Sequence, residues 1–536
     1  MLSIRLSGWR LRLRLRPRLR RRTWVVLGLA LVILLGAGGW KLRPYLARYV
    51  PYTFAVNSTG DGGDANLADG VCQTSTRGQC TLRAAIEQAN ARAGRDTIVF
   101  NVKGNGVHTI KPAFGPLPAI TQPIVIDGYT QPGATPNTNP AGGPSNAVLR
   151  IELNGASAGS FANGLAVTAG YATIRGLAIN GFAEGSAIHL ENAGGSFIEG
   201  NFIGTDAAGT RDLGNRVGIA VFSGSNNNTI GGAAAAARNV ISGNRDDGLQ
   251  LGGTSNTVLG NLIGADATGA RALANGGRGL TLTGSFNTVG GSAPDVGNVI
   301  AFNTEGGVGV LGATGNSILA NSIHSNGGPG IDLPARASSL QPAPALSSAM
   351  AEDSTVHGIL RTSAGATARL ELFTTSTCDP RKSAGKTFVG STSVTADDAG
   401  SAVFQARTDT ALAVGEFITA TSTDHSTGTS TFSKCVQVPG VFTVNSTADS
   451  GDASPNDGRC ETVIPGECTL RAAIDEGNAS GRMNFTRFAI NGPGPHAITP
   501  ESALPPIMQP MLIDGYTQPG AAPNTSPSGS PLTRLS

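Results

Sequence analysis

Two places in the sequence bring together residue types that could do chemistry, and the first is a charged cluster. Arg245, Asp246 and Asp247 are consecutive, and Arg278 follows about one sequence repeat later. Cleavage of a glycan needs paired carboxylates, or a base beside a charge-neutralising cation. We therefore consider the two aspartates and Arg278 as catalytic candidates, with His189 as a separate candidate base. The alternative is that Arg-Asp-Asp-Gly is a polar turn before a strand, and that His189 is a solvated surface histidine.

The second place is a glycine-rich loop with three aspartates, each of which recurs 388 residues later. The two sets are Asp61, Asp64 and Asp69, and Asp449, Asp452 and Asp457. Several carboxylates in one loop could bind Ca²⁺, which prefers oxygen ligands. Aspartates that accept hydrogen bonds within a turn explain the pattern nearly as well. The sequence contains no Ser-His-Asp grouping, phosphate-binding loop or haem motif, so no cofactor other than calcium is expected.

The six cysteines fall into three local pairs. The pairs are Cys72 and Cys80, Cys378 and Cys435, and Cys460 and Cys468. In an exported chain these pairs predict three disulfides. Zinc binding is the alternative, but two cysteines with seven residues between them and no histidine nearby make a poor zinc site.

The N-terminus is expected to carry an export signal, which is either an uncleaved membrane anchor or a cleaved signal peptide. Residues 1–23 hold nine arginines and no acidic residue, and residues 24–40 form an uncharged apolar run of 17. Such a run nearly spans a bilayer, and the excess of positive charge before it predicts a cytoplasmic arm and an exported body. Small residues at 36–39 also allow cleavage by a signal peptidase. We expect either a single-pass membrane protein with its body in the periplasm or at the cell surface, or a secreted protein.

The composition of the body limits its partners. After residue 50 the chain carries 39 − 12 = 27 basic and 36 acidic residues, a net charge of −9. This acidic balance argues against a nucleic-acid partner. The 75 glycines and the 14% of charged residues favour turn-rich β structure over a helical enzyme.

Internal repeats predict how the body folds. The strings SFIEGNFIG, NTVLGNLIG and NSILANSIH start 60 residues apart, at 196, 256 and 316. A shorter Gly-led repeat marks seven short strands whose central residues point outward. These central residues are Ala166, His189, Ala220, Gln250, Thr281, Gly309 and Asp332. Three short strands per repeat predict an all-β fold, a right-handed parallel β-helix.

Asparagines occupy one repeated position of this pattern, two residues before an isoleucine. They are Asn201, Asn239, Asn261, Asn298 and Asn321. We expect them to form an inward ladder of amides, one per coil. The alternative is that each is an independent turn residue in the left-handed conformation.

A short amphipathic helix is expected to close the start of the β-helix. In CTLRAAIEQAN, residues 80–90, the apolar side chains share one face, and CTLRAAIDEGN repeats the segment at 468–478. The expected organisation is a cap plus β-helix over 53–333, a linker over 334–350, and a small immunoglobulin-like β-sandwich over 351–438. An incomplete second copy of the cap module would occupy 442–536, because no Gly-led repeat follows it.

These motifs resemble those of a known family. The CTLRAAI strings resemble the CSLREA-type N-terminal module of bacterial exported proteins, and GNFIGTDAAGT and NTIGG resemble the pectate-lyase-like β-helix repeats that follow it. The resemblance covers about residues 53–536 and implies a cell-envelope or secreted protein. Related folds include polysaccharide lyases and hydrolases, which is an analogy of fold only.

The outward strand positions favour a rod without enzymatic activity. Among the seven, only His189 and Asp332 are ionisable, and they lie five coils apart. We therefore expect a tethered or secreted rod for adhesion, carbohydrate contact or spacing, with the membrane and a carbohydrate or cell-surface ligand as partners. The alternative is a polysaccharide lyase or hydrolase that acts on an outer face. Charged groups converging in one groove would favour the enzyme, and a smooth face of small residues would favour the rod.

Overall fold

The computed structural model describes residues 2–6, 9–13, 51–140, 142–333 and 341–523. Strands β1 (Leu2–Leu6) and β2 (Trp9–Leu13) pair antiparallel near the N-terminus. The expected membrane segment 24–40 and most of the basic arm lie outside the described residues. Within the described ranges, no helix has the length and apolar character needed to cross a bilayer.

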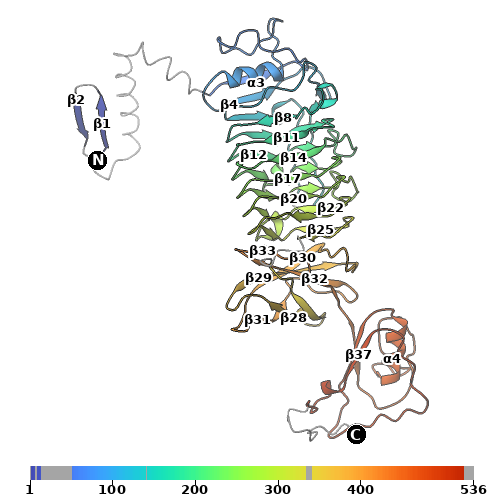
Figure 1. Cartoon of the computed structure of the whole chain (residues 1–536). Helices are drawn as coiled ribbons and strands as arrows, with labels where there is room; N and C mark the ends of the chain where they lie inside the picture. Colours follow the sequence, from blue (N-terminus) through green and yellow to red (C-terminus); the bar gives the residue numbers. More distant parts are fainter. Residues whose placement is uncertain (1, 7–8, 14–50, 141, 334–340, 524–536) are drawn as a thin grey trace.

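Short strands between residues 53 and 332 form three parallel sheets stacked into a β-helix (Figure 1). The nine-stranded sheet contains β3 (Thr53–Val56), β4 (Asp96–Phe100), β6 (Ile124–Asp127), β9 (Thr173–Arg175), β12 (Phe197–Glu199), β15 (Thr229–Gly231), β18 (Thr257–Leu259), β21 (Thr288–Gly290) and β24 (Ser317–Leu319). The eight-stranded sheet contains β5 (His108–Ile110), β7 (Ile151–Asn154), β10 (Leu177–Asn180), β13 (Phe202–Ile203), β16 (Val240–Ile241), β19 (Leu262–Ile263), β22 (Val299–Ala301) and β25 (Ser322–His324). The seven-stranded sheet contains β8 (Leu165–Val167), β11 (Ser186–Leu190), β14 (Val217–Val221), β17 (Leu249–Leu251), β20 (Leu280–Leu282), β23 (Val308–Val310) and β26 (Ile331–Asp332). These seven strands are the Gly-led strands of the sequence, in the expected order.

The core of the β-helix consists of stacked aliphatic columns. Each short strand turns one or two side chains inward, where they meet the same position of the coils above and below. Ile174, Ile198 and Ile230 are fully buried neighbours in the nine-stranded sheet. Burying one such side chain is worth about 1.5–3 kcal/mol, so the stack supplies its own core.

Asparagine ladders hold the corners between the sheets. In the predicted ladder from Asn201 to Asn321, each side-chain amide donates to the Oδ1 of the next asparagine at 2.8–3.3 Å. The ladder is confirmed, and the other two corners carry ladders of their own. One contains Asn215, Asn244, Asn275, Asn303 and Asn326; the other contains Asn228, Asn256, Asn287 and Asn316. Each ladder satisfies backbone amides that the turns would otherwise leave buried and unpaired.

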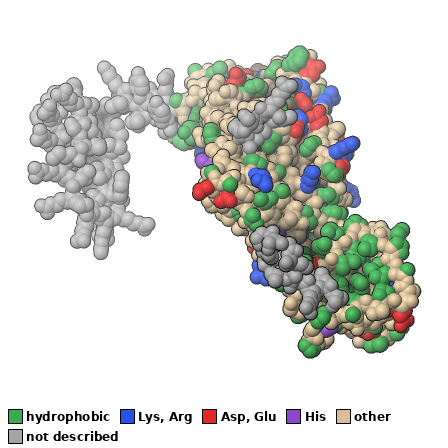
Figure 2. All heavy atoms as spheres, turned by 60° about the horizontal axis from the view of Figure 1, so that its bottom comes forward, with side chains coloured by type: hydrophobic (Ala, Val, Ile, Leu, Met, Phe, Trp, Pro, Cys, Tyr) green, Lys and Arg blue, Asp and Glu red, His purple; other side chains and the backbone are tan. Residues whose placement is uncertain are grey.

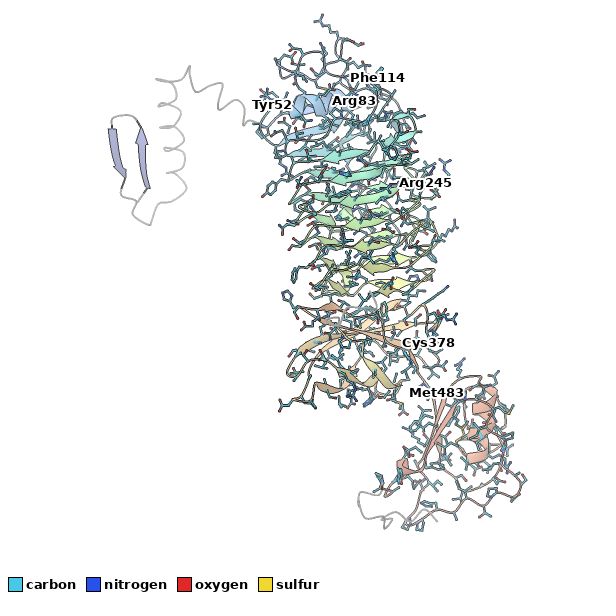
Figure 3. All side chains as sticks on the ribbon, in the orientation of Figure 1. Tyr52, Arg83, Phe114, Arg245, Cys378 and Met483 are labelled. Atoms are coloured by element: carbon cyan, nitrogen blue, oxygen red, sulfur yellow. A yellow bond between two sulfur atoms is a disulfide. The ribbon has the colours of Figure 1, made fainter. Side chains whose placement is uncertain are left out.

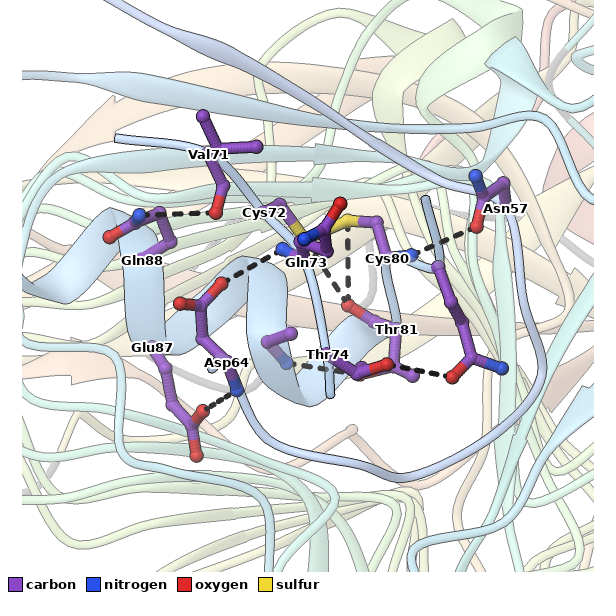
Figure 4. The surroundings of a disulfide bond; sticks show 12 residues. Asn57, Asp64, Val71, Cys72, Gln73, Thr74, Cys80, Thr81, Glu87 and Gln88 are labelled. Atoms are coloured by element: carbon purple, nitrogen blue, oxygen red, sulfur yellow. Dashed lines mark hydrogen bonds between the residues drawn. A yellow bond between two sulfur atoms is a disulfide. The ribbon is translucent and has the colours of Figure 1, made fainter. Parts of the chain in front are cut away.

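Helix α3 (Leu82–Asn90) lies across the first coil (Figure 1). The side chain of Thr81 caps its N-terminus by accepting the amide of Ala84, and Leu82 and Ile86 are buried in the core of the β-helix. The Cys72–Cys80 disulfide pins the preceding loop against the helix (Figure 4). Short 3-10 helices lie in the connections: η1 (Gly128–Thr130), η2 (Gly155–Ser157), η3 (Ala235–Ala237) and η4 (Pro294–Val296).

Two antiparallel sheets follow the β-helix and share one apolar core. One contains β27 (Ala345–Met350), β28 (Thr355–Arg361) and β31 (Ser401–Arg407); the other contains β29 (Thr367–Thr375), β30 (Thr387–Thr395), β32 (Phe417–Asp424), β33 (Gly428–Thr429) and β34 (Val436–Gln437). Cys378 and Cys435 are joined, as expected. Phe373 and Phe432 belong to the core of the β-helix, so these sheets close its C-terminal end.

The C-terminal part repeats the start of the chain. Strands β35 (Gly440–Val444), β36 (Asn484–Phe488) and β37 (Met511–Asp514) form a parallel sheet beside α4 (Leu470–Ala479), with η5 (Gly515–Thr517) after β37. The Cys460–Cys468 disulfide corresponds to Cys72–Cys80 in the first copy. Figure 2 shows many apolar side chains gathered on the surface of this part.

Candidate functional site

The outer face of the seven-stranded sheet carries the residues that the sequence suggested for chemistry. Strand register places the seven outward residues in one column, from Ala166 in β8 through His189 and Gln250 to Asp332 in β26. Small residues occupy much of the column. Polar and charged side chains gather at two positions along it.

Arg278 is the centre of the larger polar group. It stands just before β20, and its Nη2 lies 3.0 Å from Oδ2 of Asp332 and its Nη1 3.6 Å from Oε2 of Glu305. The side chain crosses the backbone of Gly309, where an added Cβ would lie 2.6 Å from Cδ of Arg278. Glycine at this position therefore lets one guanidinium join carboxylates from two further coils.

Asp247 belongs to the same group, but both of its carboxylate oxygens are engaged. Oδ1 accepts the backbone amide of Arg278 at 2.8 Å, and Oδ2 accepts Nε2 of Gln250 at 3.0 Å. Its neighbour Asp246 is half-buried, and Arg245 lies exposed on the rod (Figure 3). Because both oxygens are engaged, a role for Asp247 in orienting Arg278 is favoured over a role in exchanging protons with a ligand.

His189 forms a separate group with an aromatic neighbour. Its ring lies 4.6 Å from the ring of Phe222, with 34° between the planes, and its Nε2 is 3.7 Å from Glu191. Three coils separate β11, which holds His189, from β20, a distance of about 14 Å at the usual strand spacing. The structure therefore does not bring His189 together with Arg278.

Aromatic side chains line the corner between the seven- and nine-stranded sheets, a feature that the sequence analysis missed. The residue two before each strand from β9 to β24 has a left-handed backbone, with φ between 56° and 70°. These residues are Tyr171, Gly195, Asn227, Ser255, Phe286 and Gly315. Bulky residues rarely adopt this conformation, so an aromatic side chain here needs local support.

Tyr171 and Phe286 are exposed over the next coil of this corner. Tyr171 is 67% and Phe286 51% exposed. A Cβ added at Gly315 would lie 2.5 Å from the ring of Phe286, and one at Gly195 would lie 2.9 Å from the ring of Tyr171. Glycine in the following coil thus makes room for each ring to lie along the rod.

The three aspartates of the first loop, Asp61, Asp64 and Asp69, each bind different partners. Both carboxylate oxygens of Asp61 bind the guanidinium of Arg83, with a shortest distance of 2.9 Å. Asp64 accepts the amide of Gln73 at 3.0 Å (Figure 4). Asp69 accepts Nε2 of Gln88 at 3.1 Å. Among the described residues, no group of three or more His, Cys, Asp or Glu side chains is placed to hold a metal ion. The hydrogen-bonding explanation accounts for the contacts of all three.

No protein-family model and no curated protein matches the chain. The CSLREA-type resemblance therefore stays an expectation from the sequence. Solved structures with a similar course of the chain include full-length tailspike protein 2 of Escherichia coli O157:H7 bacteriophage CAB120, at 12% identity and a TM-score of 0.16. That match covers 63% of this chain and only 59% of the tailspike.

Two further tailspikes show comparable likeness. The Dettilon tailspike protein is 10% identical over 66% of this chain and 92% of its own, with a TM-score of 0.18. A tailspike of Acinetobacter baumannii bacteriophage Fri1, a capsular polysaccharide depolymerase, is 10% identical over 64% of this chain and 68% of its own, with a TM-score of 0.15. At these scores the likenesses carry no conclusion about the function of this chain.

Proposed function

We propose that this chain is a bacterial envelope protein whose β-helix binds an extended polysaccharide without cleaving it. The observation that carries the proposal is the pair of exposed rings, Tyr171 and Phe286, in one corner column beside the polar face of the seven-stranded sheet. Aromatic faces stack well on the apolar faces of sugar rings, while polar side chains bind the hydroxyl groups. The corner and the sheet face together offer both kinds of contact.

The spacing of the two rings supports a polymer as the ligand. Four coils separate Tyr171 from Phe286, or about 19 Å at the usual strand spacing of 4.8 Å. A single sugar unit is too short to touch both rings. Phe222, which is 49% exposed, follows β14 on an intermediate coil and adds a third apolar contact near the same edge.

We infer the cellular location of the rod, and its attachment, from the rest of the chain. Three disulfides support a body outside the cytoplasm. Residues 24–40 would tether it to the membrane as a single span, or be removed as a signal. Residues 351–438 would form an immunoglobulin-like sandwich, and 442–536 an incomplete second CSLREA-type module.

A polysaccharide lyase or hydrolase is the second candidate, and the carboxylates around Arg278 favour it. Glu305 and Asp332 both face one guanidinium, and both side chains are substantially exposed, at 58% and 40%. Against catalysis, Arg278 holds both carboxylates and Asp247 has neither oxygen free. We therefore assign this group to ligand contact.

The test uses the full-length chain, screened against immobilised glycans and then titrated with the best polymer. Tyr171→Asn and Phe286→Asn retain the backbone, because Asn227 already adopts this conformation in the same column. We expect the double variant to bind at least tenfold more weakly, a loss of about 1.4 kcal/mol. The matched control is Phe114→Asn, whose ring is 77% exposed elsewhere on the molecule.

Equal affinity of the double variant and the wild type would refute binding at this corner. Release of shorter glycans by the wild type, abolished by Glu305→Gln or Asp332→Asn, would establish the enzyme instead. Binding by the wild type without release of products would support the proposed rod.

A further inference from the structure

The last coil of the β-helix is bonded directly to the sheets that follow it. Ile323 and Gly385 exchange two backbone hydrogen bonds, of 2.8 and 3.0 Å, and Gly330 donates to the carbonyl of Ser383 at 3.0 Å. The hydroxyl of Ser322 donates to the carbonyl of Lys386 at 2.5 Å. The loop 376–386, between β29 and β30, is therefore held against the rod at several points.

A disulfide anchors the other end of this loop. Cys378 is bonded to Cys435, which lies just before β34 (Figure 3). The loop thus has a fixed position between the rod and the sandwich core. Side chains that it presents toward the last coil are positioned by covalent and backbone bonds.

A cavity of about 430 Å³ lies between the loop and the last coil. This volume is within the usual range of small-molecule sites, about 300–1,000 Å³. The loop contributes Lys382 and Lys386, and the last coil contributes His324 and Ser325. Hydroxyl groups are abundant in the lining, so a ligand with several hydroxyls would find many partners.

The charges in this cavity favour an anion. Neither Lys382 nor Lys386 forms an ion pair with a carboxylate in the part of the chain that the structure describes. Asp379 also lines the cavity, and its Oδ1 accepts the amide of Arg381 at 2.9 Å. Burial, and next the charge of Lys386, lower the pKa of His324 to about 4, so the imidazole is neutral at pH 7. Two cations therefore face the cavity against one carboxylate, a net charge of 2 − 1 = +1.

We propose that this cavity binds a hexuronic acid unit, with its carboxylate between Lys382 and Lys386. The hydroxyls of the sugar would meet Ser325 of the last coil and Thr377 of the loop, which both line the cavity. An ammonium group binds a carboxylate as a compact point charge, and hydroxyl side chains can both donate and accept. The site is distinct from the aromatic corner, and it does not depend on polysaccharide binding there.

The experiment titrates the full-length chain with galacturonate and, in parallel, with galactose, which lacks the carboxylate. Binding is followed by calorimetry and by the ¹³C-labelled His324 Cε1–H resonance. We expect galacturonate to bind and to shift this resonance, and galactose to do neither. Lys382→Ala with Lys386→Ala should weaken galacturonate at least tenfold, whereas Lys103→Ala, an exposed lysine of the first module, should change nothing.

Inorganic phosphate supplies the remaining comparison. Phosphate binding as tight as galacturonate would show a site for charge alone and would overturn the sugar assignment. Galactose binding equal to galacturonate, no binding of galacturonate, or full affinity in the lysine double variant would each overturn the proposal. Retained affinity in Lys386→Arg, with loss in Lys386→Ala, would confirm the part played by the charge.

Discussion

At the scale of single residues, Arg83 organises the first module, which is the N-terminal cap formed by α3 and the loop before it. Its guanidinium pairs with Asp61 at 2.9 Å and donates to the carbonyls of Gly115 and Pro116, each at 2.8 Å. The side chains of this ion pair are only 10% and 4% exposed. Removing one partner of such a pair leaves the other charge buried and uncompensated.

This ion pair leads to a prediction that also tests for calcium. Arg83→Met should lower the free energy of unfolding of the rod by about 3 kcal/mol, because Asp61 loses its partner. A chelator should leave the melting temperature of the wild type unchanged, because the aspartates of the loop accept hydrogen bonds from the protein itself. Arg77→Met, at an exposed arginine nearby, is the control. A fall in melting temperature with chelator that added Ca²⁺ reverses would instead identify a calcium site.

The lowered pKa of His324 predicts how the stability of the last coil depends on pH. Burial, followed by the nearby charge of Lys386, lowers its pKa from 6.5 to about 4. Lys382 and Asp379 line the same cavity, and Asp295 lines an adjoining one. Because the folded protein favours the neutral imidazole, this stabilisation is complete above pH 6.5 and is lost as the pH falls from 6.5 to 4.

Thermal unfolding of His324→Gln and the wild type between pH 4 and 7.5 measures this effect. The advantage of the wild type should shrink by about 2 kcal/mol toward pH 4, after allowance for the partial exposure of the ring. His425→Gln, at an exposed histidine, should run parallel to the wild type. A constant difference between His324→Gln and the wild type across the whole range would contradict the prediction.

At the scale of elements, the ladders show what the sequence can and cannot predict. The ladder through Asn261 was predicted because each asparagine stands two residues before an isoleucine in the following strand. The ladder through Asn275 was missed because the distance from the preceding strand to each asparagine varies: Asn275 follows the end of β19 by 12 positions, and Asn303 follows the end of β22 by two. The aromatic corner was missed for another reason: Tyr171 and Phe286 share their position with glycine, asparagine and serine, so no single residue type marks it. The six positions share a left-handed backbone conformation, but they do not share a residue type.

The middle of the predicted ladder should be sensitive to substitution. In Asn261→Ala, the backbone and side-chain amides of Asn239 lose their acceptor. Oδ1 of Asn298 loses the side-chain donor of Asn261 and keeps the backbone one. Each buried unsatisfied group costs about 1–3 kcal/mol, so we expect a loss of roughly 2–4 kcal/mol in unfolding free energy. Asn227→Gly, at an exposed left-handed turn position, should cost far less. Chemical denaturation of the two variants makes the comparison, and equal losses would mean that the ladder adds little.

At the scale of the whole molecule, the two copies of the first module differ in what covers them. In the first copy the chain continues with β9, so that Ile126 is fully buried, Arg175 pairs with Asp127 at 2.7 Å, and Tyr129 donates to the carbonyl of Gly200 at 2.7 Å. In the second copy no described strand follows β37 in its sheet. Ile513, which corresponds to Ile126, is 37% exposed, and the adjacent Leu512 is 51% exposed.

Two anchoring contacts inside the second copy match those of the first. Arg471 pairs with Asp449 at 2.7 Å, as Arg83 does with Asp61. Thr469 caps α4 through the amide of Ala472. The second module therefore keeps the local structure of the first, while among the described residues no further coil stacks on β37 to bury its sheet.

We predict that the second module unfolds before the rod does. Its sheet has few apolar contacts to lose. Its links to the preceding antiparallel sheets include an exposed ion pair between Arg487 and Glu352, of a kind worth about 0–1 kcal/mol. Limited proteolysis of the full-length chain, followed by mass spectrometry, should therefore cut within residues 440–523 first. Calorimetry should show a lower transition that disappears after trimming, while the transition of the rod keeps its temperature. A module that resists protease as long as the rod, or a rod that melts earlier once the module is gone, would contradict this view of the C-terminal part.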